Sequence, residues 1–391
     1  MVASPDGVLH LVFHSGPTPA SDFRYARCAQ DCGQAANWTV TTVDTGTPLM
    51  NRTRLALGPD GRLHALYETD ELGLSQTIYS SCAANCTQAS SWSKVYLTSL
   101  FVGQSAGWRG APLAVDSQGR VSFIVSTLTI NATLTIATCA ANCDSVGSWT
   151  TGLFRQGGSR TVMVARGTAL HAVTHNDNDS LVYRTCASDC TVTANWQESP
   201  PLFIHDGYMP TSIAVTAQGG VRVAYNQGPS ASSQTPPIKA QDNRMLVWSC
   251  DANCLAAAGW NGIMLGDSRE GEEGIALVEL GGALAVAATN SIDANVHVCN
   301  SGCTEAANWG RAPVDSSEAF RLQYDPVTYG SAGCSNGNAS FAAWYLDDGV
   351  IAVRPDGSAA LAFGSHMLRK CNPLQTMASY LPGFGRLVWL P

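Results

Sequence analysis

The pattern C-x3-C-x5-W occurs six times in this chain, and its regular spacing limits the folds that the chain can adopt. The copies begin at Cys28, Cys82, Cys139, Cys186, Cys250 and Cys299. Successive copies are about 54 residues apart, a period typical of arrays and propellers in which each repeat is one supersecondary unit. The sequence therefore indicates one large repetitive domain.

The chain has 14 cysteines, an even number, and two interpretations of the pairs compete. Zinc needs four ligands at one point, whereas each pair supplies two and no histidine follows at a fixed distance. A disulfide needs Cα atoms about 4.4–6.8 Å apart, which a spacing of four residues allows. We therefore expect disulfides rather than metal sites or free thiols. The expected pairs are Cys28–Cys32, Cys82–Cys86, Cys139–Cys143, Cys186–Cys190, Cys250–Cys254 and Cys299–Cys303, with Cys334 and Cys371 holding the C-terminal tail.

Disulfides persist in oxidising compartments, so we expect a secreted, periplasmic or cell-surface protein. The N-terminal MVASPDGVLH has neither a basic n-region nor an apolar h-region, so no signal peptide is expected in this chain. A net charge of −8, without any basic block, argues against a nucleic-acid partner. No apolar run is long enough to span a bilayer.

Each repeat has the same order of apolar runs and turns. A first run ends on a turn signal, as in Arg54–Gly61 (RLALGPDG), Pro112–Gly119 and Ser212–Gly219. A second run follows directly, a third ends on the first cysteine, and a fourth follows the tryptophan. Four short strands per repeat, with no segment of helical period, predict the blade of a β-propeller.

The fold prediction is an all-β, seven-bladed propeller of four-stranded antiparallel blades in a single domain, 1–391. The approximate blades are 1–46, 47–103, 104–157, 158–206, 207–267, 268–315 and 316–391, and six of them carry the cysteine turn. The first unit starts almost at Met1, so we expect a strand from the C-terminal tail to close the ring. Six blades with an irregular extension is the alternative.

The repeated tryptophans have two interpretations. One tryptophan at the same place in each blade is expected to pack between blades and to cover its own disulfide. The alternative is a set of exposed platforms on which sugar rings stack.

We expect a ligand site on the face of the ring opposite the turn signals and cysteine turns. Loops on a rigid scaffold commonly carry function, and the loops of that face differ most between repeats. Arginines stand just before several first strands, at Arg52, Arg54, Arg109, Arg160 and Arg321. An arginine ring favours an anionic ligand through charge-assisted hydrogen bonds. Tyr208 is expected on the same rim.

A second set of candidates occupies the last inward position of each second strand. The set is His14, Glu68, Ser126, His175, Asn226, Thr289 and Trp344. It is polar in most blades and different in each, which favours one asymmetric site. The alternative for the arginines is solvation or pairing with Glu272, Glu273 or Glu318. We expect His10, His64 and His171, which follow the turns, to be buried and hydrogen-bonded.

The repeats SPDGVLHLVFH and LGPDGRLHALY resemble the DG-x-[IL]-H strand-turn-strand of bacterial BNR-type propellers. That group includes ulvan-type polysaccharide lyases, sialidase-like proteins and seven-bladed lectins. The resemblance covers the repeat skeleton, but the sialidase Asp-box is absent and C-x3-C-x5-W is not a feature of the group. Lyases of this kind use histidine and tyrosine with arginine, which implies catalytic roles for His14, His175 and Tyr208 beside Arg160.

Three functions follow as hypotheses. The first is an extracellular carbohydrate- or surface-ligand-binding propeller, with anionic glycans as the expected ligand at Arg52, Arg54, Arg109, Arg160, Arg321, Glu68, Asn226 and Trp344. The second is a polysaccharide lyase, favoured over a glycosidase, acting at the central channel. The third is a protein-interaction or structural scaffold. We expect no cofactor, and nothing indicates structural calcium.

Overall fold

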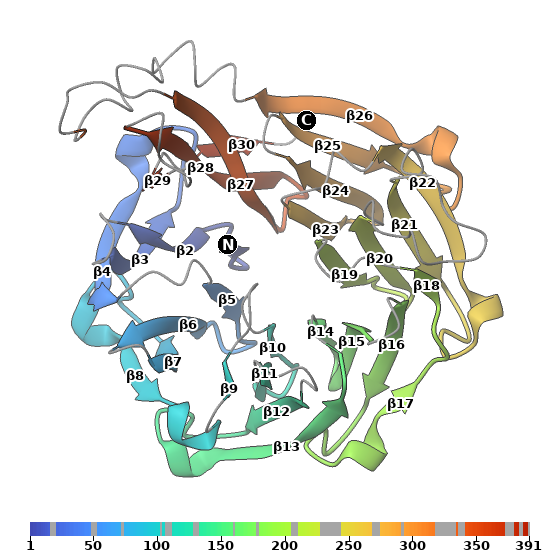
Figure 1. Cartoon of the computed structure of the whole chain (residues 1–391), viewed down its shortest axis with the longest axis horizontal. Helices are drawn as coiled ribbons and strands as arrows, with labels where there is room; N and C mark the ends of the chain where they lie inside the picture. The colour runs from blue at the N-terminus through green and yellow to red at the C-terminus, as the bar shows by residue number, and fades with distance from the viewer. Residues whose placement is uncertain are drawn as a thin grey trace.

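The computed structural model describes residues 1–15, 21–47, 53–71, 74–101, 104–105, 112–127, 133–158, 161–176, 180–204, 210–226, 244–267, 274–290, 293–316, 334, 341–371, 379–382 and 386–389. Its strands form seven antiparallel sheets. Figure 1 shows them as a ring, with the first strand of each sheet nearest the centre. The protein is therefore a seven-bladed β-propeller, as the repeat predicts, and the six-bladed alternative is wrong.

The first three blades take up the first 156 residues. Blade 1 contains β1 (Val2–Ala3), β2 (Leu9–Ser15), β3 (Ser21–Cys28) and β4 (Thr39–Thr47). Blade 2 contains β5 (Arg54–Leu57), β6 (Leu63–Glu71), β7 (Leu74–Cys82) and β8 (Ser93–Tyr96). Blade 3 contains β9 (Gln104–Ser105), β10 (Leu113–Val115), β11 (Val121–Thr127), β12 (Thr133–Cys139) and β13 (Trp149–Gln156).

The next three blades repeat this order. Blade 4 contains β14 (Thr161–Arg166), β15 (Ala169–His175), β16 (Ser180–Cys186), β17 (Gln197–Glu198) and β18 (Phe203–Ile204). Blade 5 contains β19 (Thr211–Val215), β20 (Val221–Asn226), β21 (Arg244–Cys250) and β22 (Asn261–Asp267). Blade 6 contains β23 (Gly274–Leu280), β24 (Ala283–Thr289), β25 (Asp293–Cys299) and β26 (Gly310–Ser316).

Blade 7 differs from the others. It contains β27 (Phe341–Val353), β28 (Ala359–Lys370), β29 (Ser379–Pro382) and β30 (Arg386–Trp389). Both β29 and β30 pair with β28, one after the other along its length. The structure differs from the expected closure, because no described strand of the tail joins the sheet of blade 1, which is β1-β2-β3-β4.

The hydrophobic core is divided into seven clusters, each between two neighbouring blades. Between blades 2 and 3, for example, Tyr79 packs with Phe123 and Trp149. Between blades 7 and 1, Ala352 and Ala360 pack with Leu9. Apolar residues on both faces of a strand are therefore buried, which explains why the second runs are nearly continuous in apolar character.

The cysteine turns have the predicted disulfides. All six C-x3-C pairs are bonded, and so are Cys334 and Cys371. The residue before the second cysteine has a left-handed backbone, with φ between 47° and 62°. This residue is Asp31, Asn85, Asn142, Asp189, Asn253 or Gly302, the residue types that tolerate positive φ. A short 3₁₀ helix then leads to the tryptophan.

Six of the seven described 3₁₀ helices belong to these turns. They are η1 (Ala35–Asn37), η2 (Ala89–Ser91), η4 (Val146–Ser148), η5 (Thr193–Asn195), η7 (Ala257–Gly259) and η9 (Ala306–Asn308), and the other is η3 (Thr98–Leu100). No helix in the described ranges is both long and apolar enough to cross a membrane.

The tryptophans pack between blades, which confirms the first interpretation. Trp92, Trp149, Trp196 and Trp260 are 6–8% exposed. In all six repeats the indole Nε1 donates a hydrogen bond of 2.7–3.1 Å to the carbonyl of the second cysteine. The tryptophan therefore fixes its own turn and also fills the interface with the preceding blade.

The two kinds of turn share one face of the ring, as predicted. In blade 5, Arg222 follows the first turn and Asp251 lies in the cysteine turn, and their side chains form a salt bridge of 2.6 Å. Cysteine turns also hold the outer strand of the preceding blade. The Thr41 hydroxyl of β4 donates to the carbonyl of Thr87 in blade 2 at 2.7 Å.

Candidate functional site

The second-strand candidates point into the interfaces between blades. Val12 lies in the cluster between blades 1 and 2, and alternate residues of a strand share a face, so His14 faces blade 2. Its ring centroid lies 5.7 Å from that of Phe23 and 6.3 Å from that of Tyr67. Burial lowers the pKa of His14 to about 4. The imidazole is therefore neutral at pH 7.

His14 is half-buried, and the equivalent residues of four other blades are buried. Glu68 is 2% exposed, His175 6%, Asn226 0% and Thr289 1%. They lie on β6, β15, β20 and β24, so each faces a different interface. They are interior polar residues of the ring, and their role in binding a ligand stays a prediction.

Trp344 lies in a different strand from the one predicted. The sequence LDDG after it reads as a turn, but the chain continues through it as β27, with a register shift between Leu346 and Gly349. The true turn of this blade ends at Gly357, where φ is +83°. Trp344 is therefore on the first strand of blade 7 and not on a second strand.

Among the arginine candidates, the structure describes Arg54. It is the first residue of β5, at the end of the strand opposite the turn, and it is half-buried. Its Nη1 donates to the carbonyl of Thr53 at 3.1 Å. The other four arginines, Arg52, Arg109, Arg160 and Arg321, lie outside the described residues, and so does Tyr208.

The histidines that follow the turns have a structural partner, as predicted. The Nδ1 atoms of His10, His64 and His171 lie 2.6–2.7 Å from the hydroxyls of Tyr25, Tyr79 and Tyr183. Burial lowers the pKa of all three histidines and raises that of the three tyrosines. Each pair is therefore a neutral hydrogen-bonded contact between the second and third strands.

A polar contact between blades 1 and 2 was missed by the sequence reasoning. The Tyr67 hydroxyl donates to Asp44 Oδ2 at 2.9 Å, and Lys94 Nζ lies 2.9 Å from Asp44 Oδ1. Burial, together with the charge of Asp44, raises the pKa of Tyr67. The three residues come from β6, β4 and β8, so no local sequence pattern connects them.

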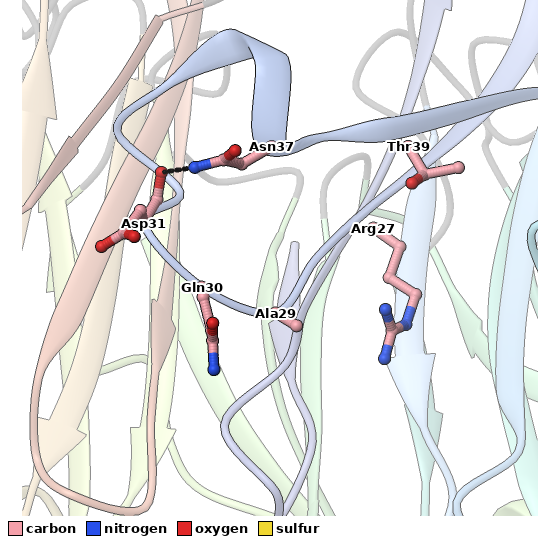
Figure 2. Close-up of a pocket in the computed structure, with 6 residues that line it drawn as sticks. All are labelled: Arg27, Ala29, Gln30, Asp31, Asn37 and Thr39. Carbon is pink, nitrogen blue, oxygen red and sulfur yellow. Dashed lines mark hydrogen bonds between the residues drawn. The ribbon is translucent and has the colours of Figure 1, made fainter.

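The structure also has a polar hollow of about 270 Å³ beside the cysteine turn of blade 1. It is lined by Arg27, Ala29, Gln30, Asp31, Asn37 and Thr39. Figure 2 shows the side chains of Arg27 and Gln30 extending to the same side of the turn, while Asp31 lies beyond Gln30. The signal in the sequence was Arg27, because the residue before the first cysteine is uncharged in the other five repeats.

Within the described ranges, no three histidine, cysteine, aspartate or glutamate side chains are grouped so that they could hold a metal ion. The described cysteines are all in disulfides. Such bonds fit an oxidising compartment outside the cytosol.

Comparison with known proteins places the fold. No family model and no curated protein matches the chain. Among solved structures it is similar to the polysaccharide lyase Uly1, at 10% identity and a TM-score of 0.50, over 100% of this chain and 88% of that one. It is also similar to an α-L-arabinanase from Penicillium chrysogenum complexed with arabinobiose, at 10% identity and a TM-score of 0.50, over 87% and 92%.

A protein of unknown function from Dyadobacter fermentans matches at 9% identity and a TM-score of 0.51, over 86% of this chain and 92% of that one. The chain spans less than two thirds of two longer chains that it resembles, 64% of TolB from Acinetobacter baumannii and 61% of the sialidase Hz136. The likenesses with TM-scores of 0.50 and 0.51 agree with the propeller fold.

Proposed function

We propose that this protein is a carbohydrate-binding β-propeller that acts in a secreted or periplasmic setting and binds anionic glycans without cleaving them. The binding region is the face of the ring opposite the cysteine turns, where Arg54 begins β5. Polysaccharide cleavage at the central channel is the alternative, and the experiment below separates the two.

We favour binding over catalysis because the two histidines that could act as general bases, His14 and His175, are enclosed by the fold to a large extent. A general base must lie within hydrogen-bond reach of the proton that it removes. His175 is 6% exposed, and His14 is packed against Phe23 and Tyr67 in the interior of an interface. The His175 side chain is therefore buried and the His14 side chain half-buried, which favours binding over proton abstraction.

The charge of the expected ligand follows from arginine. Arg54 is a fixed cation at the inner end of a blade, and a guanidinium binds carboxylates and sulfates through paired hydrogen bonds. Two of the similar solved structures are named as carbohydrate-active proteins, the lyase and the arabinanase, which supports a glycan over a protein ligand.

A glycan array of uronate-containing, sulfated, sialylated and neutral polysaccharides tests the proposal. We expect binding to the anionic members alone and weaker binding at high salt, because exposed charges are screened. Arg54→Ala is expected to weaken binding about tenfold through the loss of charge-assisted hydrogen bonds. Arg166→Ala is the matched control, since Arg166 ends β14 at the opposite face.

The same glycans are then incubated with the protein and followed by ultraviolet absorbance of unsaturated uronates. A signal that disappears in Tyr208→Phe would establish the lyase instead. Equal binding of neutral and anionic glycans would refute the expected preference for anionic ligands. The absence of binding to any glycan would refute the proposal as a whole and favour a scaffold.

A further inference from the structure

The hollow beside the blade 1 cysteine turn can be compared with the same place in blade 2. Three residues lie in one row across β2, β3 and β4, namely His10, Arg27 and Thr39. The corresponding row of blade 2 is His64, Ser81 and Ser93. Both rows lie at the end of the blade next to the cysteine turn.

In blade 2 this row receives a carboxylate from the neighbouring blade. Asp144 directly follows Cys143, and its Oδ1 accepts hydrogen bonds from the hydroxyls of Ser81, at 3.0 Å, and Ser93. Its Oδ2 lies 3.9 Å from Nη1 of Arg62. In blade 2, therefore, the Asp144 carboxylate lies between the two serine hydroxyls and the Arg62 guanidinium.

In blade 1 the equivalent carboxylate is replaced by a threonine. Thr87 follows Cys86 as Asp144 follows Cys143, and it contacts the outer strand through its carbonyl and Thr41. The row itself has gained a positive charge, Arg27. Within the part of the chain that the structure describes, no carboxylate lies within ion-pair distance of the Arg27 guanidinium, and its side chain makes no hydrogen bond.

The remaining lining of the hollow suits hydroxyl groups. Gln30 and Asn37 carry amides, Thr39 a hydroxyl and Asp31 a carboxylate, and together they both donate and accept hydrogen bonds. The Asn37 amide is partly used, since it donates to the Asp31 carbonyl at 3.1 Å. Because Asp31 accepts hydrogen bonds from hydroxyl groups, a ligand with one carboxylate and several hydroxyls uses more of this lining than an inorganic anion does.

We propose that this hollow binds a carboxylated monosaccharide unit, with its carboxylate on Arg27 and its hydroxyls on Gln30, Asp31 and Thr39. The ligand carboxylate takes the place that Asp144 fills in blade 2. The site lies on the face of the cysteine turns, so it is separate from the glycan-binding region proposed at Arg54.

The probe is sodium D-glucuronate, with D-glucose as the uncharged match, at constant ionic strength. Binding is followed by the amide chemical shifts of Ala29, Gln30 and Asp31. We expect glucuronate to shift these amides, and glucose to bind about tenfold more weakly, since a charge-assisted hydrogen bond is lost. Arg27→Ser introduces the residue that blade 2 has at the equivalent position, Ser81, and is expected to weaken glucuronate binding by a similar factor.

Thr87→Asp provides a second test from the opposite side. The new carboxylate is placed as Asp144 is placed in blade 3, so it is expected to pair with Arg27, raise the melting temperature and block glucuronate. Thr191→Asp is the matched control, because it makes the same change in blade 4. It faces the row Ser122, Thr138 and Thr150, which has no arginine.

Three results would overturn the inference. These are shifts of equal size with glucose, no shift of the three amides with glucuronate, and unchanged binding in both Arg27→Ser and Thr87→Asp. In each case binding of polymers at Arg54 is measured separately on the array, so the failure of this site and the failure of the proposed function are distinguishable.

Discussion

The histidine–tyrosine pairs show how a repeated motif has a structural use at the scale of single residues. His64 is 4% exposed, and its Nδ1 lies 2.6 Å from the Tyr79 hydroxyl. Burial lowers its pKa from 6.5 to about 4. The folded protein therefore holds this side chain neutral, whereas the unfolded chain takes up a proton once the pH falls below about 6.5.

We predict that acid destabilises the protein through these pairs. The contribution of neutral His64 to folding is fully present above pH 6.5 and is lost as the pH falls toward 4, by up to about 1.4 kcal/mol per pH unit. His64→Gln keeps a hydrogen-bonding side chain that does not titrate. Urea unfolding between pH 4 and 7 is expected to show a shallower pH dependence for this variant.

The control for this prediction is the same substitution at His10, which is paired with Tyr25 in blade 1 and also has its pKa lowered to about 4. Both single variants should reduce the pH dependence, and the double variant should reduce it further. An unchanged pH dependence in all three would contradict the account.

At the scale of elements, the disulfides fall into two classes that differ in the length of chain they close. Each cysteine turn joins residues four apart, whereas Cys334 and Cys371 are 37 apart. Loop-closure entropy gives about 2 kcal/mol for the short ring and about 4 kcal/mol for the long one. The turns therefore fix local geometry, and the long bond restrains the tail.

We predict that replacing both Cys334 and Cys371 by alanine lowers the free energy of unfolding about twice as much as replacing both Cys139 and Cys143. Equilibrium urea unfolding under non-reducing conditions measures the difference. Equal losses for the two double variants would show that packing around Trp149, rather than chain entropy, dominates the contribution of the short bond.

The elements also show which features a sequence can predict. The strands, turns and disulfides depend on residues close together in the chain, such as Asn142 before Cys143 or Gly61 after the first strand of blade 2. The direction of His14 depends on Phe23 and Tyr67, which come from other strands. The sequence therefore predicts the place of such a polar residue along its strand, but not which side chains of other strands surround it.

Blade 7 is the case in which the prediction placed a residue, Trp344, on the wrong strand. Asp347, Asp348 and Gly349 have the composition of a turn, but the pairing of β27 with β28 continues on both sides of them. Gly349 fits there because its missing side chain leaves room for Leu361 and Thr289. Tertiary packing therefore turned a sequence typical of a turn into an irregularity within one long strand.

At the scale of the whole molecule, the interface between blades 7 and 1 differs from the other six. Those six join blades that follow one another in the chain, whereas blades 7 and 1 stand at opposite ends of it. In the described residues this interface depends on side chains, among them Trp389, Leu387, Leu9 and Cys32. The Arg354 guanidinium lies 4.4 Å from the centroid of the Trp389 ring.

We predict that Trp389→Ala opens the ring at this interface. Truncation of a partly buried aromatic side chain there is expected to lower the unfolding free energy by about 2 kcal/mol, somewhat less than at a fully buried site. The loss of stability should be local. The interface between blades 7 and 1 is not joined by the chain, so it is expected to open before the other blades unfold. Hydrogen exchange is therefore expected to accelerate first in β1, β2, β27 and β30.

Trp309→Ala is the matched control, because Trp309 is a half-buried tryptophan at the interface of blades 5 and 6. It should lower stability without selective exchange in blades 1 and 7, since that interface is also joined by the chain. If Trp389→Ala accelerates exchange evenly around the ring, the closure is no weaker than any other interface. Selective exchange at blades 1 and 7 would instead show that the side chains of the tail hold the propeller closed.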